Sequence, residues 1–115
     1  MTETENNEVI IYEICDYLVC NYALKQVPKE LKQKIIEFLK ENGAHWDEYV
    51  SRLDRETKAH YYFYSAPPKS IHKIDFSSLS SKLGVKITVE PVYSWWLFLE
   101  YCDSETLEDE DHFFS

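Results

Sequence analysis

The chain contains very little glycine and proline, with 2 Gly and 4 Pro among its 115 residues. So few glycines exclude a collagen-like chain and the glycine-rich loops that bind phosphate in nucleotide-binding proteins. No apolar run approaches the roughly 18 residues that a membrane-spanning helix needs. The N-terminus is acidic and polar, whereas a secretory signal requires a basic start and an apolar stretch. We therefore expect neither a membrane anchor nor a secretory signal.

Patterns that indicate catalysis or metal binding are also scarce. The three cysteines, Cys15, Cys20 and Cys102, form no C-x-x-C pair, and the four histidines show no H-E-x-x-H spacing. An odd number of cysteines without a signal peptide predicts reduced, buried thiols in the cytoplasm of a bacterium, or of its host if the protein is phage-encoded. We expect no metal, no small-molecule cofactor and no catalytic site. An enzyme or metal protein that uses Cys102, His60 or Glu100 is kept as a third hypothesis.

Aromatic and acidic side chains, in contrast, are abundant. Apolar residues make up 44% of the chain and aromatic residues 16%, which is enough for one hydrophobic core. The 21 acidic and 12 basic residues give a net charge of −9. Residues 1–8 and 103–115 hold acids and no base, while 9–102 holds 12 of each sign. The sequence therefore predicts an acidic N-terminal arm (1–8), a single neutral domain (9–102) and an acidic C-terminal tail (103–115).

The first half of the chain shows three helix-like patterns. Residues 8–25 have apolar side chains at helical spacing, although the β-branched run Val9-Ile10-Ile11 leaves a strand over 9–17 as the alternative. A second helix is expected from Pro28 to Asn42-Gly43, because proline suits the first turn and glycine suits the position after the last. Residues 46–56 are expected to form a short helix with one apolar face.

The second half is dominated by strand patterns. Residues 59–64 and 92–101 are rich in aromatic side chains, and residues 85–90 alternate apolar with polar. Asp75 is a candidate cap for a short helix that Gly84 ends. Strands 85–90 and 92–101 are too close in sequence for a crossover helix, so we expect them to pair antiparallel.

These patterns together favour an α+β fold. We expect a single domain in which helices pack on one face of a small, mainly antiparallel sheet of three or four strands. If residues 9–17 form a strand instead, the order becomes βαββ with a further helix before Val85.

A series of short motifs in the same region resembles a known family. The motifs are a helix ending in LKENG, the strand HYYFY, a short helix ending in KLG, the strand VKITV and then WWLFLEY. Residues 30–102 resemble the regulator of ribonuclease activity B family in this pattern, although Ala44-His45 stand where that family usually has acidic residues. The resemblance implies a compact, acidic α+β protein that acts by binding a ribonuclease.

The charge distribution favours a binding protein without catalytic activity. We expect it to inhibit or modulate a basic nucleic-acid-processing enzyme, in the manner of nuclease inhibitors, immunity proteins and phage anti-restriction or anti-CRISPR proteins. The alternative is a small nucleic-acid-binding module that uses the lysine-rich segments 25–40 and 58–86. Alternating side chains of a strand face opposite ways, so some aromatic residues are expected to be available to a partner. The predicted partner-binding residues are Asp103, Glu105, Glu108, Asp109, Glu110, Asp111, Phe113, Phe114, Tyr62, Tyr64 and Trp95.

Overall fold

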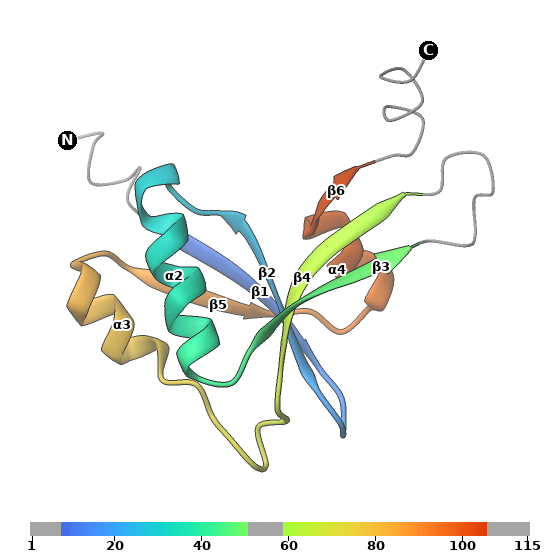
Figure 1. Cartoon of the computed structure of the whole chain (residues 1–115), viewed down its shortest axis with the longest axis horizontal. Coiled ribbons are helices and arrows are strands. Elements are labelled where there is room, and N and C mark those ends of the chain that lie inside the picture. The colour runs from blue at the N-terminus through green and yellow to red at the C-terminus, as the bar shows by residue number, and fades with distance from the viewer. Residues whose placement is uncertain (1–7, 51–58, 106–115) are drawn as a thin grey trace.

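The computed structural model describes residues 8–50 and 59–105 (Figure 1). Three helices and a mixed sheet form one α+β domain, which confirms the predicted fold class. The elements follow one another as β1 (Val9–Cys15), β2 (Cys20–Gln26), α2 (Lys29–Glu41), β3 (His45–Val50), β4 (His60–Ala66), α3 (Phe76–Leu83), β5 (Ile87–Pro91), α4 (Trp95–Tyr101) and β6 (Asp103–Glu105).

The sheet is larger than the expected three or four strands. Its strand order is β3-β4-β2-β1-β5, and the short β6 pairs with residues 60–62 of β4, beyond the residues of β4 that pair with β2. The parallel β1–β5 pair is the exception among otherwise antiparallel pairings. Helices α2 and α3 each connect strands that run the same way and are not neighbours. α2 leads from β2 to the edge strand β3, whereas α3 leads from the oppositely directed β4 to the other edge strand, β5. For right-handed crossovers these two reversals cancel, so both helices lie on the same face of the sheet.

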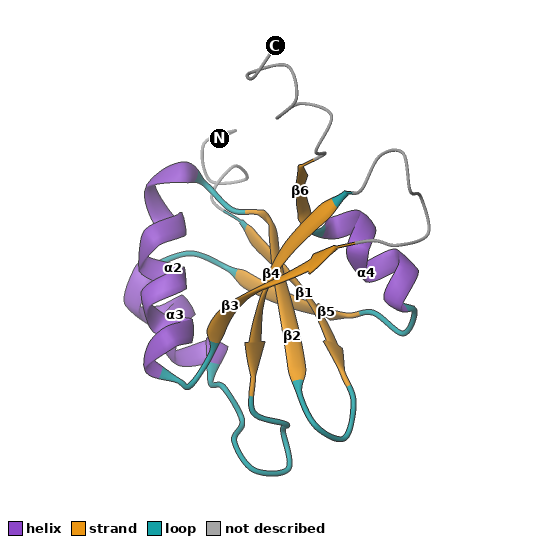
Figure 2. Cartoon of the chain, turned by 45° about the vertical axis from the view of Figure 1, so that its right-hand side comes forward, coloured by secondary structure: helices purple, strands orange, loops and turns teal. Residues whose placement is uncertain are grey.

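The third helix covers the other face. Figure 2 shows α2 and α3 on one side of the sheet and α4 on the opposite side. The core is accordingly divided into two clusters. One joins Ile35 and Leu39 of α2 to Ile11 of β1, and the other joins Phe98 of α4 to Ala23 of β2. The expectation that all helices lie on one face therefore holds for α2 and α3 but not for α4.

The helix predicted over residues 8–25 is wrong, and the strand alternative is confirmed. β1 and β2 form an antiparallel hairpin in which Cys15 is opposite Cys20. The carboxylate of Asp16 accepts hydrogen bonds from the backbone N–H groups of Leu18 and Val19, at 2.7 and 2.9 Å. This local turn places the apolar residues on two strands, so their helical spacing in the sequence is coincidental.

The hairpin also changes the expected state of two cysteines. Cys15 and Cys20 form a disulfide across the hairpin, whereas they were predicted to be reduced thiols. Directly opposed residues of neighbouring strands are close enough for such a bond, with Cα atoms 4.0 Å apart. Cys102 is buried and takes no part in this disulfide, as expected.

Two further segments have the opposite secondary structure from that predicted. The short helix expected over residues 46–56 is wrong for residues 46–50, which lie in β3, and residues 51–56 of that prediction lie outside the described residues. Residues 92–101, expected to be a central strand paired with 85–90, contain α4 instead. In α4 the adjacent Phe98 and Leu99 are both buried while Trp96, which would share a strand face with Phe98, is 62% exposed, a distribution that fits the single buried face of a helix.

The predicted helices after Pro28 and Asp75 are confirmed. The carboxylate of Asp75 accepts hydrogen bonds from the N–H groups of Ser77 and Ser78, at 3.1 and 3.3 Å, and Gly84 ends α3 with a left-handed φ of 69°. Serine-rich sequences have only modest helix propensity, so this short helix depends on its caps and on buried Leu79.

Removal of the Asp75 cap is expected to destabilise the domain. Asp75→Ala leaves two helix N–H groups without their acceptor, and we expect the free energy of unfolding to fall by about 1 kcal/mol. Asp75→Asn keeps an acceptor oxygen and is expected to change stability by less than half as much. Urea denaturation followed by circular dichroism measures both. Equal losses for the two variants would show that the cap is not the source of the effect.

Candidate functional site

Two adjoining hollows form a groove beside α4. One is lined from β2, β3 and β4, the other from β1 and the residues before α4, with volumes of about 390 and about 350 Å³. Asp16, Asn21 and Trp95 line both hollows, and we call the combined feature the Trp95 groove. It brings together the β1–β2 turn, the start of β3 and the start of α4, which are far apart in the sequence.

The indole of Trp95 is held in place by other aromatic rings. It stacks on Phe98 with ring centroids 5.3 Å apart, and it makes edge contacts with Phe63 at 5.7 Å and Tyr49 at 6.3 Å. Trp95 nevertheless remains 38% exposed. An aromatic side chain whose position is fixed before binding loses little conformational entropy when a partner covers it.

The side chains of Asp16 and Asp47 supply negative charge to the groove. One oxygen of Asp16 accepts the turn hydrogen bonds described above. Oδ1 of Asp47 accepts from the N–H of Glu48 at 2.9 Å, and Oδ2 lies 3.2 Å from the Ser65 hydroxyl oxygen, whose single proton is shared with Asn21. These bonds orient both carboxylates without neutralising them. Among the described residues, neither forms an ion pair.

The floor of the groove is polar and buried. Ser65 is 3% exposed and Asn21 is 6% exposed, and the Ser65 hydroxyl donates to Oδ1 of Asn21 at 2.7 Å. Ser65 pairs with Asn21 on one side and with His45 on the other, so the register of three strands aligns these side chains. A buried polar pair of this kind is satisfied internally and serves to fix the geometry of the Asp47 carboxylate above it.

The lining of the Trp95 groove has a one-sided charge. It includes two carboxylates and, within the described ranges, no lysine or arginine. An aromatic face next to carboxylates is the arrangement that attracts a guanidinium or ammonium group, through cation–π and charge-assisted contacts. The groove is therefore suited chemically to hold a basic side chain.

The predicted partner-binding residues are distributed over several parts of the fold. Trp95 lies in the groove, while Tyr62 stacks on Trp46 at 5.0 Å on the face that carries α2. Tyr64 packs against the core, and burial and then the charge of Asp103 raise the pKa of its hydroxyl. Asp103 pairs with Lys32 of α2 at 3.5 Å. Glu105 ends β6, and Glu108, Asp109, Glu110, Asp111, Phe113 and Phe114 lie outside the described residues.

Two other hypotheses concern an enzyme or metal site and a nucleic-acid-binding module. In the described part of the chain, the three residues considered for the enzyme or metal site do not form a shared site. Cys102 is buried with its thiol 3.4 Å from the Phe98 carbonyl oxygen, His60 Nδ1 lies 3.1 Å from Glu48 Oε1, and Glu100 is exposed on α4. Within residues 8–50 and 59–105, no three potential metal-ligating side chains gather. In the lysine-rich segments, Lys32 and Lys69 are each paired with a carboxylate.

Sequence reasoning missed Asp16 and Asp47 because it assigned both to helices, where acids are ordinarily solvated. The signal for Asp16 was its place between Cys15 and Cys20, in a segment short enough for a hairpin turn.

No helix in the described part of the chain has the length and apolar character needed to cross a membrane. Comparison of the chain with known protein families, with curated proteins and with solved structures found no match.

Proposed function

We propose that this protein is a non-enzymatic binding protein that inhibits or modulates a basic, nucleic-acid-processing enzyme. In this proposal the Trp95 groove binds a basic side chain of that enzyme. The observation that carries the proposal is the composition of the groove, in which two oriented carboxylates and a half-exposed tryptophan share a described lining that contains no lysine or arginine. Enzymes that bind nucleic acid expose lysine and arginine for phosphate, so they offer such side chains at the surface that an inhibitor must block.

The rest of the molecule supports the same kind of partner. The chain carries a net charge of −9, and the excess of acid lies in the two terminal segments. Long-range attraction from this charge accelerates encounter with a basic surface, while the groove supplies specific contacts after encounter. The resemblance of residues 30–102 to the regulator of ribonuclease activity B family makes a basic ribonuclease the first partner to test. Action in the cytoplasm, with no membrane and no cofactor involved, is part of this proposal.

The test compares two double variants that change the net charge equally. Asp16→Asn with Asp47→Asn keeps one acceptor oxygen at each position for the backbone N–H groups that bond to it, but removes the negative charge of the groove. Glu90→Gln with Glu100→Gln removes two exposed charges outside it. We expect the first variant to bind an arginine-rich nonapeptide about tenfold more weakly than the second, measured by calorimetry. It should also inhibit a basic ribonuclease less, measured by cleavage of a fluorogenic RNA. Equal behaviour of both variants would refute the role of the groove.

The acidic C-terminal segment is tested separately. A chain ending after Glu105 keeps β6 and removes the four acids of 108–111. We expect slower association with the same ribonuclease at 20 mM salt and no difference at 500 mM salt, because screening removes long-range attraction. Stopped-flow fluorescence measures the rates. If the shortened chain associates at the wild-type rate at low salt, the acidic C-terminal segment contributes nothing to the encounter with the ribonuclease.

A further inference from the structure

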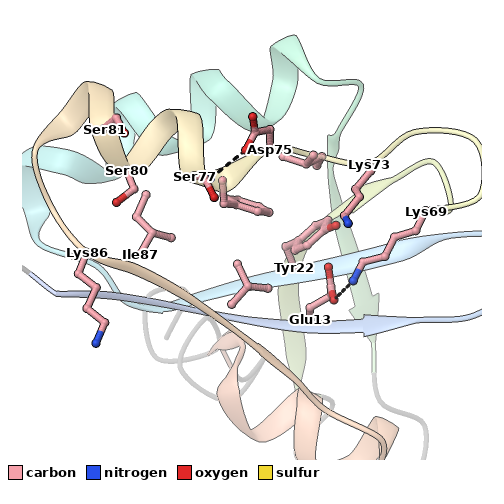
Figure 3. Close-up of a pocket in the computed structure, with 13 residues that line it drawn as sticks. Glu13, Tyr22, Lys69, Lys73, Asp75, Ser77, Ser80, Ser81, Lys86 and Ile87 are labelled. Carbon is pink, nitrogen blue, oxygen red and sulfur yellow. Dashed lines mark hydrogen bonds and ion pairs between the residues drawn. The ribbon is translucent and has the colours of Figure 1, made fainter.

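A larger hollow lies on the opposite face of the sheet, between α3 and strands β1 and β5 (Figure 3). Its volume is about 860 Å³, which is within the range of small-molecule sites. The loop between β4 and α3 supplies one wall, with Lys69 and Lys73. The Trp95 groove and this hollow are separated by the sheet, so any function of the hollow is independent of the function proposed above.

The floor of the hollow contains a buried charge. Along β1 the side chains facing α2 and α3 are Val9, Ile11 and then Glu13, whose side chain is only 7% exposed. Its Oε1 accepts a hydrogen bond from the Lys69 ammonium at 2.6 Å, and it is also hydrogen-bonded to the hydroxyl of Tyr22. A carboxylate at a core position is costly unless it is paired, so Lys69 is committed to neutralising Glu13.

Lys73 has a different role, because no carboxylate among the described residues pairs with it. Figure 3 shows its side chain extending into the hollow above Tyr22, whereas Lys86 at the opposite end points away. The carboxylate of Asp75 accepts hydrogen bonds from the first N–H groups of α3 and keeps its negative charge. Three lysines and two carboxylates line the hollow, so its described residues offer a ligand a net charge of +1, and Lys73 is the unpaired lysine that extends into it.

The remaining wall is apolar. Phe76 of α3 and Ile87 and Val89 of β5 line the hollow and are partly exposed, next to buried Ile74. β5 is an edge strand that pairs with β1 alone among the described strands, and α3 covers it only in part. Partly exposed apolar side chains that converge on one charged group are typical of a site for a small amphipathic molecule.

We infer that this hollow binds a small organic monoanion with an apolar body, whose acidic group contacts Lys73 and whose body rests on Phe76, Ile87 and Val89. A multiply charged ligand such as inorganic phosphate is disfavoured, because the described lining has a net charge of only +1 and is largely apolar around Lys73. An uncharged ligand would leave Lys73 without a partner.

The inference is tested with 8-anilinonaphthalene-1-sulfonate, an aromatic monoanion whose fluorescence increases in apolar surroundings. Titration of the full chain is expected to show saturable binding. Lys73→Gln should weaken the affinity about fivefold, because an ion pair at a partly exposed site is lost. Lys86→Gln is the matched control, since it removes the same charge from the rim of the same hollow, and it should bind the probe as the wild type does.

Two further measurements separate this site from alternatives. The uncharged analogue N-phenyl-1-naphthylamine should bind the wild type and Lys73→Gln equally. The Asp16→Asn, Asp47→Asn variant should bind the sulfonate probe normally, so failure of the groove proposal leaves this result unaffected. Equal affinity of Lys73→Gln and Lys86→Gln for the sulfonate, with both variants folded by circular dichroism, would overturn the inference.

Discussion

Replacement of Phe98 by alanine is expected to lower the free energy of unfolding by about 3–5 kcal/mol. Phe98 is fully buried at the centre of the cluster between α4 and the sheet, and its ring contacts both Trp95 and Phe63 at centroid distances of 5.3 and 5.7 Å. Truncation leaves a cavity that rigid neighbours cannot fill. Because Phe98 also supports Trp95, the variant should bind a basic partner more weakly even under conditions where it remains folded. Urea denaturation monitored by tryptophan fluorescence gives the change in stability.

Trp96→Ala is the control for this experiment. Trp96 lies two positions before Phe98 in the sequence but is 62% exposed on the outer side of α4. We therefore expect its replacement to lower the free energy of unfolding by less than about 1 kcal/mol. The comparison also tests the secondary structure of the segment. In a strand Trp96 and Phe98 would share one face, and their replacements would have similar effects. Similar losses for the two variants would contradict the helix.

Stability is expected to fall in alkaline solution, and Tyr22 is the main cause. Tyr22 is 2% exposed. Burial, then the nearby charge of Glu13 and the hydrogen bond to it, raise the pKa of its hydroxyl well above the ordinary 10.0. Above pH 10 the tyrosine ionises in the unfolded chain but stays protonated in the folded one. The folded state then holds one more proton than the unfolded state. The stabilisation that the protonated Tyr22 hydroxyl provides is therefore complete below pH 10 and is lost as the pH rises, at up to about 1.4 kcal/mol per pH unit.

The variant Tyr22→Phe is expected to flatten this alkaline decline. Tyr12 and Tyr64 also have raised pKa values, chiefly through burial, so a shallower decline should remain. Tyr17→Phe, at a position that is 97% exposed in the hairpin turn, should keep the wild-type profile. Unfolding free energies measured by urea at pH 8 to 11.5 test the prediction. A Tyr22→Phe profile parallel to that of the wild type would contradict it.

The elements that sequence analysis identified correctly have strong local signals. α2 follows a proline and ends before Asn42-Gly43, and α3 lies between the Asp75 cap and Gly84. Each of these residues acts through backbone groups only a few positions away, so its effect does not depend on the rest of the fold. β4 was identified for a related reason, because its aromatic run has high strand propensity.

The elements that were assigned wrongly have apolar spacings that suit both a helix and a strand. Residues 8–25 match a helical spacing, yet the Asp16 turn folds them into a hairpin. Residues 95–102 are apolar except for Glu100, so no period stands out. Ser94 was the overlooked signal, because its hydroxyl accepts from the N–H of Leu97 at 3.5 Å as a helix cap. In both segments, contacts with the sheet decided between conformations of similar local preference.

The sequence by itself determined the balance of charge, the two capped helices and the aromatic core of an α+β domain, because composition and capping act locally. Only the tertiary structure decided that Asp16, Asp47 and Trp95 share one groove and that Glu13, Tyr22 and Lys73 share another hollow. Strand register and the packing of α4 bring these side chains together from segments up to 79 positions apart in the sequence, between Asp16 and Trp95. Such contacts depend on the burial of whole faces, which no short stretch of sequence specifies.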